Sequence, residues 1–303
     1  MKQLEMEEYR TFTTPAELQK AVNTLHGMIS GIASDNIVRE SEIVELTHWC
    51  SLHENLRDRH PFSELLPLID KTLEDGVIDE DEKHDILWLC ANLTSNVEYY
   101  DIITSSIQFL SGFVHGALSD GELADSEILF LEGWLKNNQF LRGTYPYDEL
   151  YSLVARILED RIVTTQERET LMAFMGNLIE FKDSYNLIEA DYSKLREKYS
   201  VQGICALQPE VTFDGRLFCF TGASYKGTRA DLVDVIENLG GTFRSSVSKK
   251  TDYLIVGNAG NPCWAYSCYG RKIEEALALR KAGGKVQIVN EMDFWKAVND
   301  VGN

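Results

Sequence analysis

The chain has 303 residues, of which 44% are hydrophobic and 25% are charged, and these proportions are those of an ordinary globular protein. This length is sufficient for two or three domains. No apolar run approaches the ~18 residues that a membrane-spanning helix needs, and the acidic first residues do not resemble a signal peptide, so we expect a cytoplasmic protein with no membrane partner.

The formal net charge of −19 is distributed unevenly along the chain. Residues 1–208 contain 17 Lys and Arg against 37 Asp and Glu, whereas residues 209–303 contain 12 against 11. The two parts are therefore expected to differ in kind. The acidic part should repel nucleic acid, and the C-terminal part can tolerate it.

The acidic part repeats itself. A shift of 85 residues aligns residues 25–93 with residues 110–178 without a gap, and 22 of the 69 positions are identical, where roughly 4 or 5 are expected by chance. The identical pairs include Gly31 with Gly116 and Trp49 with Trp134. We therefore predict a duplicated all-α array of eight main helices, with the two tryptophans in equivalent buried places.

The predicted boundaries are residues 1–98 for the first helical repeat and residues 99–182 for the second. Thr14 and Pro15 have the pattern of a helix start, with Pro at the first helical position, and are expected to begin the first helix. Residues 183–211 are expected to form a helical connector followed by an extended linker.

Each repeat contains two copies of one acidic pattern. An Asp is followed seven residues later by Glu and eleven residues later by an aliphatic residue; the four Asp are Asp35, Asp75, Asp120 and Asp160. The pattern predicts that a helix ends near the Asp, that a second helix begins a few residues later, and that the aliphatic residue faces the core. Asp79 and Thr164 should each form a capping box with the Glu three residues later. Arg39 and Ala124 stand in that place in the other two copies, so the caps there must differ.

A metal site is the alternative function for these acids. "DGVIDEDE" matches the second half of an EF-hand loop, but Lys71 and Leu73 stand where the loop needs oxygen ligands. "SDGELADSEILFL" (119–131) and "EDGVIDEDEKHDI" (74–86) resemble the acidic helix junction of the TerB-like family, which consists of small all-helical domains. That resemblance implies a divalent metal as the one candidate cofactor. Its candidate ligands here are Asp75, Asp79, Glu82, Asp120 and Glu127.

From residue 212 onward, predicted strands alternate with predicted helices. Strands are expected within 216–222, 242–248, 252–257 and 285–290, and helices within 228–241, 271–284 and 291–298. Such alternation predicts a parallel sheet that is covered on both faces.

The same residues resemble a BRCT domain, of the type found at the C-terminus of bacterial NAD-dependent DNA ligases. The resemblance rests on "FTG", on "TRADLVDVIENLGGTFRSSVSKKTDYLIVG" and on "RKIEEALALRKAGGKVQIVNEMDFWKAV". It covers residues 212–300 and implies an α/β domain with a four-stranded parallel sheet. Residues 258–270 depart from it, because they are longer and more aromatic than the ligase equivalent.

The BRCT resemblance also implies a phosphate site. Its groups here are the Thr221 hydroxyl, the Gly222 backbone N–H and the Lys272 ammonium, with Arg271 as a fourth candidate. A hydroxyl, an amide donor and a cation near a helix N-terminus suit an anion. The alternative is that Thr221 and Gly222 only form a turn and that Lys272 is solvated.

Two further features of this domain are a pair of lysines and a tryptophan. Lys249 and Lys250 are candidate contacts to a nucleic-acid backbone, although two lysines in a hairpin often only face water. Trp295, on the last predicted helix, is expected in the core.

The chain contains no Lys-x-Asp-Gly, the string that carries the adenylated lysine of the ligases, so no enzyme activity is expected. The favoured function is a non-enzymatic bacterial adaptor in DNA repair, DNA replication or a phage or stress response. Its BRCT domain would bind a DNA end, a phosphopeptide or a protein, and its acidic array would recruit another protein. The alternative is a divalent-metal-responsive TerB-like sensor that uses the BRCT domain to form a homodimer.

Overall fold

The computed structural model describes residues 2–32, 39–74, 78–95, 100–199, 205–206, 209–257 and 271–301. Chain contacts divide it into two compact units. The first comprises Met1–Leu131 and Met172–Leu195, and the second comprises Glu132–Leu171 and Arg196–Asn303. The domain boundaries at residues 98, 182 and 211 come from the sequence pattern and remain a prediction.

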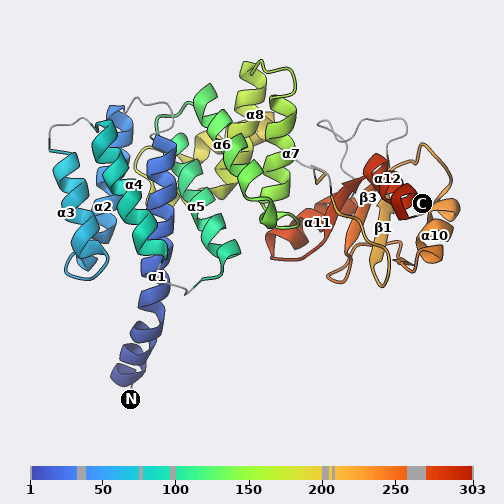
Figure 1. The fold of residues 1–303 in the computed structure, drawn as a ribbon, viewed down its shortest axis with the longest axis horizontal. Helices are drawn as coiled ribbons and strands as arrows, with labels where there is room; N and C mark the ends of the chain where they lie inside the picture. The colour runs from blue at the N-terminus through green and yellow to red at the C-terminus, as the bar shows by residue number, and fades with distance from the viewer. Residues whose placement is uncertain are drawn as a thin grey trace. The chain divides into compact units, whose positions relative to one another are not determined.

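The described residues of the N-terminal part, up to residue 199, form helices joined by turns, as the sequence predicts (Figure 1). Within the described residues, the main helices are α1 (Lys2–Ile32), α2 (Glu40–His53), α3 (Phe62–Thr72), α4 (Glu80–Ser95), α5 (Ile102–Ala117), α6 (Asp125–Asn137), α7 (Tyr147–Ile157) and α8 (Thr165–Met175). The connector contains α9 (Glu189–Lys198). None of the described helices has the length and apolarity needed to cross a bilayer.

One expected helix start is wrong. Helix α1 begins at Lys2, and Pro15 lies inside it. A proline in a helix interior removes one backbone hydrogen bond and strains the preceding turn, but here the helix continues on both sides of it.

Helices α1 and α5 lie side by side in the first unit and approach each other backbone to backbone (Figure 1). Four glycines permit this approach, because a Cβ atom on any of them would overlap backbone atoms of the facing helix. Gly27 faces Phe109, and Gly112 faces Thr24. Gly31 faces Phe113, and Gly116 faces Met28.

These contacts are reciprocal under the shift of 85 residues. Gly27 and Gly112 are counterparts, and so are the residues that they face, Phe109 and Thr24. The same holds for Gly31 and Gly116, which face Phe113 and Met28. The Asn23 amide also donates to the side-chain oxygen of Gln108, its own counterpart, at 2.7 Å. Reciprocal contacts of this kind define an interface between two related copies, and they support the proposed duplication.

The acidic junctions are helix caps. Asp79 Oδ1 accepts from the backbone N–H of Glu82 at 2.8 Å, and the Glu82 carboxylate accepts from the N–H of Asp79 at 3.1 Å. Thr164 and Glu167 make the same exchange at 3.3 and 2.9 Å. Both predicted capping boxes are therefore confirmed.

The other two caps keep only one of the two hydrogen bonds of a capping box. Glu42 accepts from the N–H of Arg39, and Glu127 accepts from the N–H of Ala124, each at 2.5 Å. Arg39 and Ala124 have no side-chain oxygen to return the bond. The residues eleven positions after each Asp are all buried, as predicted; they are Leu46, Ile86, Leu131 and Leu171.

The two tryptophans are not equally buried. Trp49 is buried and stacks on His53 with ring centroids 4.2 Å apart. Trp134 is only half-buried. The counterpart of His53 is Asn138, whose amide donates to the Trp134 carbonyl oxygen at 2.8 Å. An amide has no ring to cover the indole, so the prediction of equal burial is wrong for Trp134.

A buried carboxylate joins three segments of the first unit. Glu45 of α2 lies 2.7 Å from His115 Nε2 of α5, measured from its Oε1 atom. It also accepts from the backbone N–H groups of Tyr185 and Asn186, at 3.1 and 2.9 Å. Burial alone would raise the pKa of Glu45, but the hydrogen bonds from His115 and Asn186 outweigh it and hold the pKa below its ordinary value.

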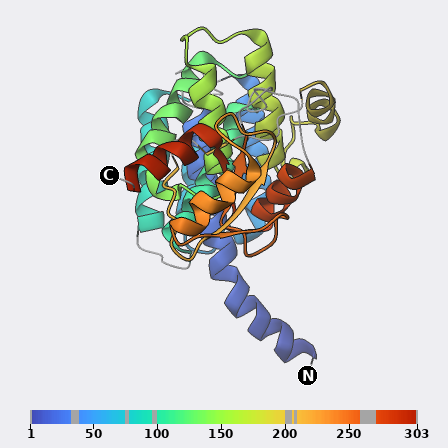
Figure 2. The same cartoon turned by 90° about the vertical axis from the view of Figure 1, so that its right-hand side faces the viewer.

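The C-terminal part is a parallel sheet between two helical layers (Figure 1, Figure 2). Its strands are β1 (Leu217–Thr221), β2 (Thr242–Phe243), β3 (Tyr253–Val256) and β4 (Gln287–Asn290), in the order β2-β1-β3-β4 with every pair parallel. Its helices are α10 (Arg229–Asn238), α11 (Arg271–Lys281) and α12 (Glu291–Val301). The predicted four-stranded parallel sheet is confirmed.

Side chains alternate between the two faces of this sheet. Phe218, Phe220 and Ile255 pack with α10 and α12 on one face. Cys219 and Leu254 pack with α11 on the other face. This period of two explains why β1, up to its terminal Thr221, and β3 are apolar, since a strand covered on both faces has no polar side.

We predict that Gly112→Ala lowers the free energy of unfolding by roughly 1–3 kcal/mol, because the new methyl group would force α1 and α5 apart. The control is Gly133→Ala on α6, where an added Cβ meets no atom within 4 Å. It should be neutral or stabilising by up to ~1 kcal/mol, because Ala favours a helix over Gly. Urea unfolding measures both, and equal effects would contradict the close packing.

We predict that Asp79→Ala lowers the free energy of unfolding by about 1 kcal/mol, the usual loss for an N-cap, with or without a chelator. Asp85→Ala, an exposed position on α4, controls for the lost charge. If EDTA alone lowered the Tm of the unmodified protein by several degrees, these acids would bind a metal.

We predict that Glu45→Gln costs more stability at pH 7 than at pH 3. A carboxylate whose folded pKa is depressed stabilises the fold above its unfolded pKa, and this contribution disappears as the pH falls through the folded pKa. Glu45 is such a group, and its ordinary value is 4.5. The difference in unfolding free energy between the two proteins should therefore shrink below about pH 4.5. A difference that is constant from pH 3 to 7 would refute the assignment.

Candidate functional site

Strand β1 ends in a tight turn at the carboxyl edge of the sheet. Thr221 is its last residue, and Gly222 follows with φ of +84°, a conformation that favours glycine. The next strand approaches closely, because a Cβ on Gly257 would clash with the backbone of Ala223. The Gly257 N–H donates to the Thr221 carbonyl oxygen at 2.8 Å. The backbone here is thus held by two glycines.

Lys272 lies beside the end of β1. It is the second residue of α11, and its Nζ donates to the carbonyl oxygen of Phe220 at 2.8 Å. Burial raises the pKa of the Cys219 thiol, and the neighbouring Lys272 ammonium acts in the opposite direction. The structure therefore brings a cation, a hydroxyl-bearing residue and a positive-φ glycine to one edge of the sheet, near a helix start. An ammonium has three N–H groups, so one bond to Phe220 leaves donors for an anion.

A buried glutamate holds the loop that follows. Glu291, the first residue of α12, is fully buried. Its carboxylate accepts from the Ser224 hydroxyl, from the Tyr225 N–H at 3.1 Å and from Trp295 Nε1 at 3.1 Å. The Lys226 ammonium lies over the Trp295 ring, 4.2 Å from its centroid. Trp295 is in the core, as expected.

Sequence reasoning missed Glu291. The only signal was an acid at the first position of a predicted helix, and such acids are common because they complement the helix dipole. Nothing in the pattern shows that this one is buried beneath the turn after β1.

The remaining basic candidates are not brought to this edge. Lys249 and Lys250 are exposed in the turn before β3. Because the strands are parallel, that turn lies at the opposite edge of the sheet from Thr221. The side chain of Arg271 lies outside the described residues.

The metal candidates have protein partners instead. Asp79 and Glu82 cap α4, and Glu127 caps α6, as described above. Asp120 accepts from the Glu122 N–H at 2.9 Å and pairs with the Arg39 guanidinium at 3.2 Å. Asp75 lies outside the described residues. Among the residues whose placement is described, no three His, Cys, Asp or Glu side chains form a metal-binding group.

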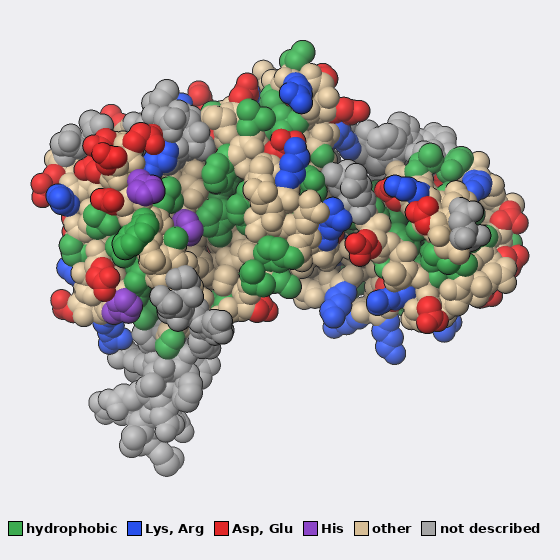
Figure 3. All heavy atoms as spheres, viewed as in Figure 1, with side chains coloured by type: hydrophobic (Ala, Val, Ile, Leu, Met, Phe, Trp, Pro, Cys, Tyr) green, Lys and Arg blue, Asp and Glu red, His purple; other side chains and the backbone are tan. Residues whose placement is uncertain are grey.

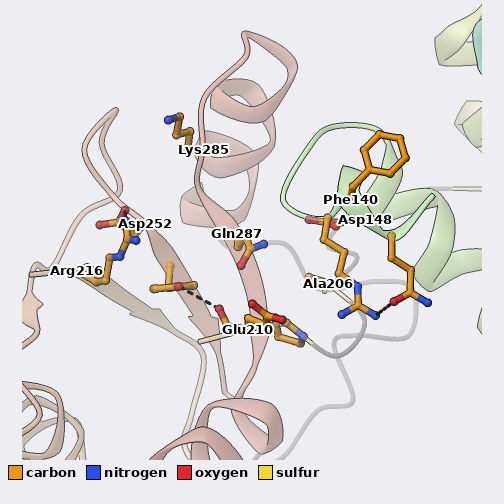
Figure 4. A pocket seen from close by; sticks show the side chains of 12 residues that line it. Phe140, Asp148, Ala206, Glu210, Arg216, Asp252, Lys285 and Gln287 are labelled. Atoms are coloured by element: carbon orange, nitrogen blue, oxygen red, sulfur yellow. Dashed lines mark hydrogen bonds and ion pairs between the residues drawn. The ribbon is translucent and has the colours of Figure 1, made fainter. Parts of the chain in front are cut away.

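The second unit contains a cavity of about 520 Å³ at the opposite edge of the sheet (Figure 4). Three of the six charged side chains that line it are in ion pairs. Arg216 pairs with Asp252, and Asp148 pairs with Arg280, each at 3.2 Å. Burial raises the pKa of Asp148 to about 6, although Arg280 acts against this shift.

Arg280 is itself buried, with 2% of its surface exposed. Its guanidinium also forms a two-bond contact with the buried carboxylate of Glu149 and donates to the Val286 carbonyl oxygen at 2.8 Å. These contacts are structural, because the Arg280 guanidinium and the carboxylates of Asp148 and Glu149 satisfy one another.

Comparison with known proteins identifies the C-terminal domain. Residues 209–292 match the family model described as BRCA1 C Terminus (BRCT) domain. The chain is also similar to bacterial DNA ligases. It is 33% identical to that of Fervidobacterium nodosum over 130 residues, which is 42% of this chain and 16% of the ligase. It is 37% identical to that of Endomicrobium trichonymphae over 98 residues, which is 30% of this chain and 12% of the ligase.

The chain therefore spans less than a fifth of the length of these ligases. No solved structure matches it. The family match agrees with the observed sheet and with the residues that carry the resemblance. Residues 209–292 form a BRCT domain that resembles the one in bacterial DNA ligases.

Proposed function

We propose that this protein is a non-enzymatic adaptor in bacterial DNA repair or replication, whose BRCT domain binds a phosphorylated ligand through Thr221, Gly222 and Lys272. The observation that carries the proposal is the contact of Lys272 Nζ with the Phe220 carbonyl oxygen at 2.8 Å. It holds the ammonium next to the Thr221–Gly222 turn, where it can contribute a charge-assisted hydrogen bond to a phosphate.

The charge distribution supports different roles for the C-terminal domain and the acidic helices. The C-terminal part is nearly neutral, with 12 Lys and Arg against 11 Asp and Glu over residues 209–303, and so tolerates a phosphorylated partner. In Figure 3, Lys and Arg side chains are prominent along one edge of this domain, whereas Asp and Glu gather over helices of the first unit. We infer that the acidic helices recruit a protein and do not bind DNA.

A DNA end is the first ligand to test, because the relatives of the BRCT domain are named DNA ligases. A phosphopeptide is the second, because the same three groups would contact its phosphate. Few cations lie near the Thr221 turn, so the affinity for DNA should fall with salt with a slope of only about two or three.

We predict that Lys272→Ala lowers the affinity for a 5′-phosphorylated duplex 10- to 100-fold, because a hydrogen bond to a charged group contributes roughly 1.5–3 kcal/mol. Lys281→Ala, an exposed lysine at the other end of α11, removes the same charge and should have little effect. Fluorescence anisotropy with phosphorylated and dephosphorylated duplexes, and with a phosphopeptide pair, measures the differences. Equal affinity for both members of every pair, unchanged in Lys272→Ala, would leave this domain as a plain protein-docking module.

A further inference from the structure

The first unit contains a second cavity, distant in sequence from the BRCT domain. It has a volume of about 350 Å³ and is bounded by α1, α2, α5 and the segment that follows α8. Its apolar walls include Met28, Trp49, Leu52 and Ile179. This volume is in the range of pockets that hold small molecules.

His115 lines this cavity, although only 7% of its surface is exposed. Its Nε2 lies 2.7 Å from the Glu45 carboxylate, which can only accept a hydrogen bond when ionised, and Glu45 already accepts from two backbone N–H groups. Nε2 therefore carries a proton.

His53 lines the same cavity and is oriented in the same manner. Its Nδ1 lies 2.8 Å from the Trp49 carbonyl oxygen, and a carbonyl only accepts, so Nδ1 carries the proton. Burial lowers the pKa of His53, which keeps its ring neutral near pH 7. Its Nε2 retains a lone pair. The cavity thus has one imidazole, that of His53, with one nitrogen engaged by the protein and the other able to accept.

The charged residues around the cavity are mostly acidic: Glu17, Glu180 and Asp183, against Lys20. Lys20 and Lys182 both pair with Glu180, at 3.2 and 3.1 Å. Within the described ranges, Glu17 and Asp183 have no ion-pair partner. The cavity therefore combines a hydrogen-bond acceptor, two carboxylates outside these ion pairs and apolar walls.

We propose that this cavity binds a small organic cation that carries a primary or secondary ammonium group on an apolar body. One ammonium N–H group would donate to Nε2 of His53. Glu17 and Asp183 would supply the opposite charge, and the carbon skeleton would lie against Met28 and Ile179. An anion would be repelled, and a neutral molecule would leave the acids without a counter-charge.

A metal ion is the competing occupant, because imidazoles held in this way are common metal ligands. The described residues contain no group of three side chains that could hold one. An organic cation needs no such group, since its own N–H groups satisfy the acceptors.

Isothermal titration of the full-length protein tests the proposal with three probes of similar shape: 2-phenylethylamine, 2-phenylethanol and 3-phenylpropionate. The amine should bind at one site, at least tenfold tighter than the alcohol, and the carboxylate should not bind. Zn²⁺ alone serves as the fourth probe. Equal binding of amine and alcohol overturns the proposal, as does tight Zn²⁺ binding without amine binding.

Two variants locate the site. Asp183→Asn should weaken amine binding at least fivefold, whereas Asp85→Asn, an exposed acid on α4 outside the cavity, should leave it unchanged. His53→Phe preserves the ring that stacks between Trp49 and Phe62 but removes the acceptor. It should therefore weaken the amine more than the alcohol, because a charged donor makes the stronger hydrogen bond. Equal losses in the two Asp variants would show only non-specific attraction to an acidic surface and refute the site.

Discussion

The contact between α1 and α5 is the constraint on which the first unit depends. Two helices with ordinary side chains stay 8–10 Å apart, but glycines at positions 27, 31, 112 and 116 let these backbones meet. The side chains that would otherwise separate the helices are absent, so the core residues on both sides must be arranged around a fixed spacing. His115 and Met28 lie on these same two helices, and their places follow from it.

The repeat accounts for one recurring set of acids in this part of the chain. Four of the 37 Asp and Glu in residues 1–208 are glutamates that accept the N–H group at the start of a helix. This bond survives even where the partner residue is Arg39 or Ala124. The glutamate is therefore the constant half of the cap, and its partner can vary. A metal is not needed to account for the pattern, because a helix start has unpaired N–H groups that attract a carboxylate.

Much of the fold could be predicted from the sequence because it follows local rules. The capping boxes at Asp79 and Thr164, the buried residues eleven positions after each Asp, and the alternation of strands and helices after residue 212 are all local patterns. The failures are long-range. Trp134 is more exposed than Trp49 because Asn138 stands where His53 stacks on Trp49. Helix α1 begins at Lys2 and not at Pro15.

The candidate site shows the same limit. Thr221, Gly222 and Lys272 could be placed through a family resemblance, whereas Glu291 could not be distinguished from an ordinary helix-start acid. Arg280 was missed for the same reason: a basic residue in the last turn of a helix is common. Only the fold shows that Arg280 is buried against Glu149 and Asp148, residues more than 130 positions away in the chain.

Helix α11 therefore has a charged side chain held by hydrogen bonds near each end: Lys272 to the Phe220 carbonyl oxygen, and Arg280 to Glu149. Arg280 cannot leave its carboxylates without exposing buried charges to an apolar surrounding, which is costly. Because a helix is a stiff rod, Lys272 at the other end cannot drift either. A ligand that reaches Lys272 would find the ammonium preorganised and would lose little conformational entropy in fixing it. If phosphate binds at the proposed site, the buried ion pair would thus support recognition at a distance of two helical turns, without contacting the ligand.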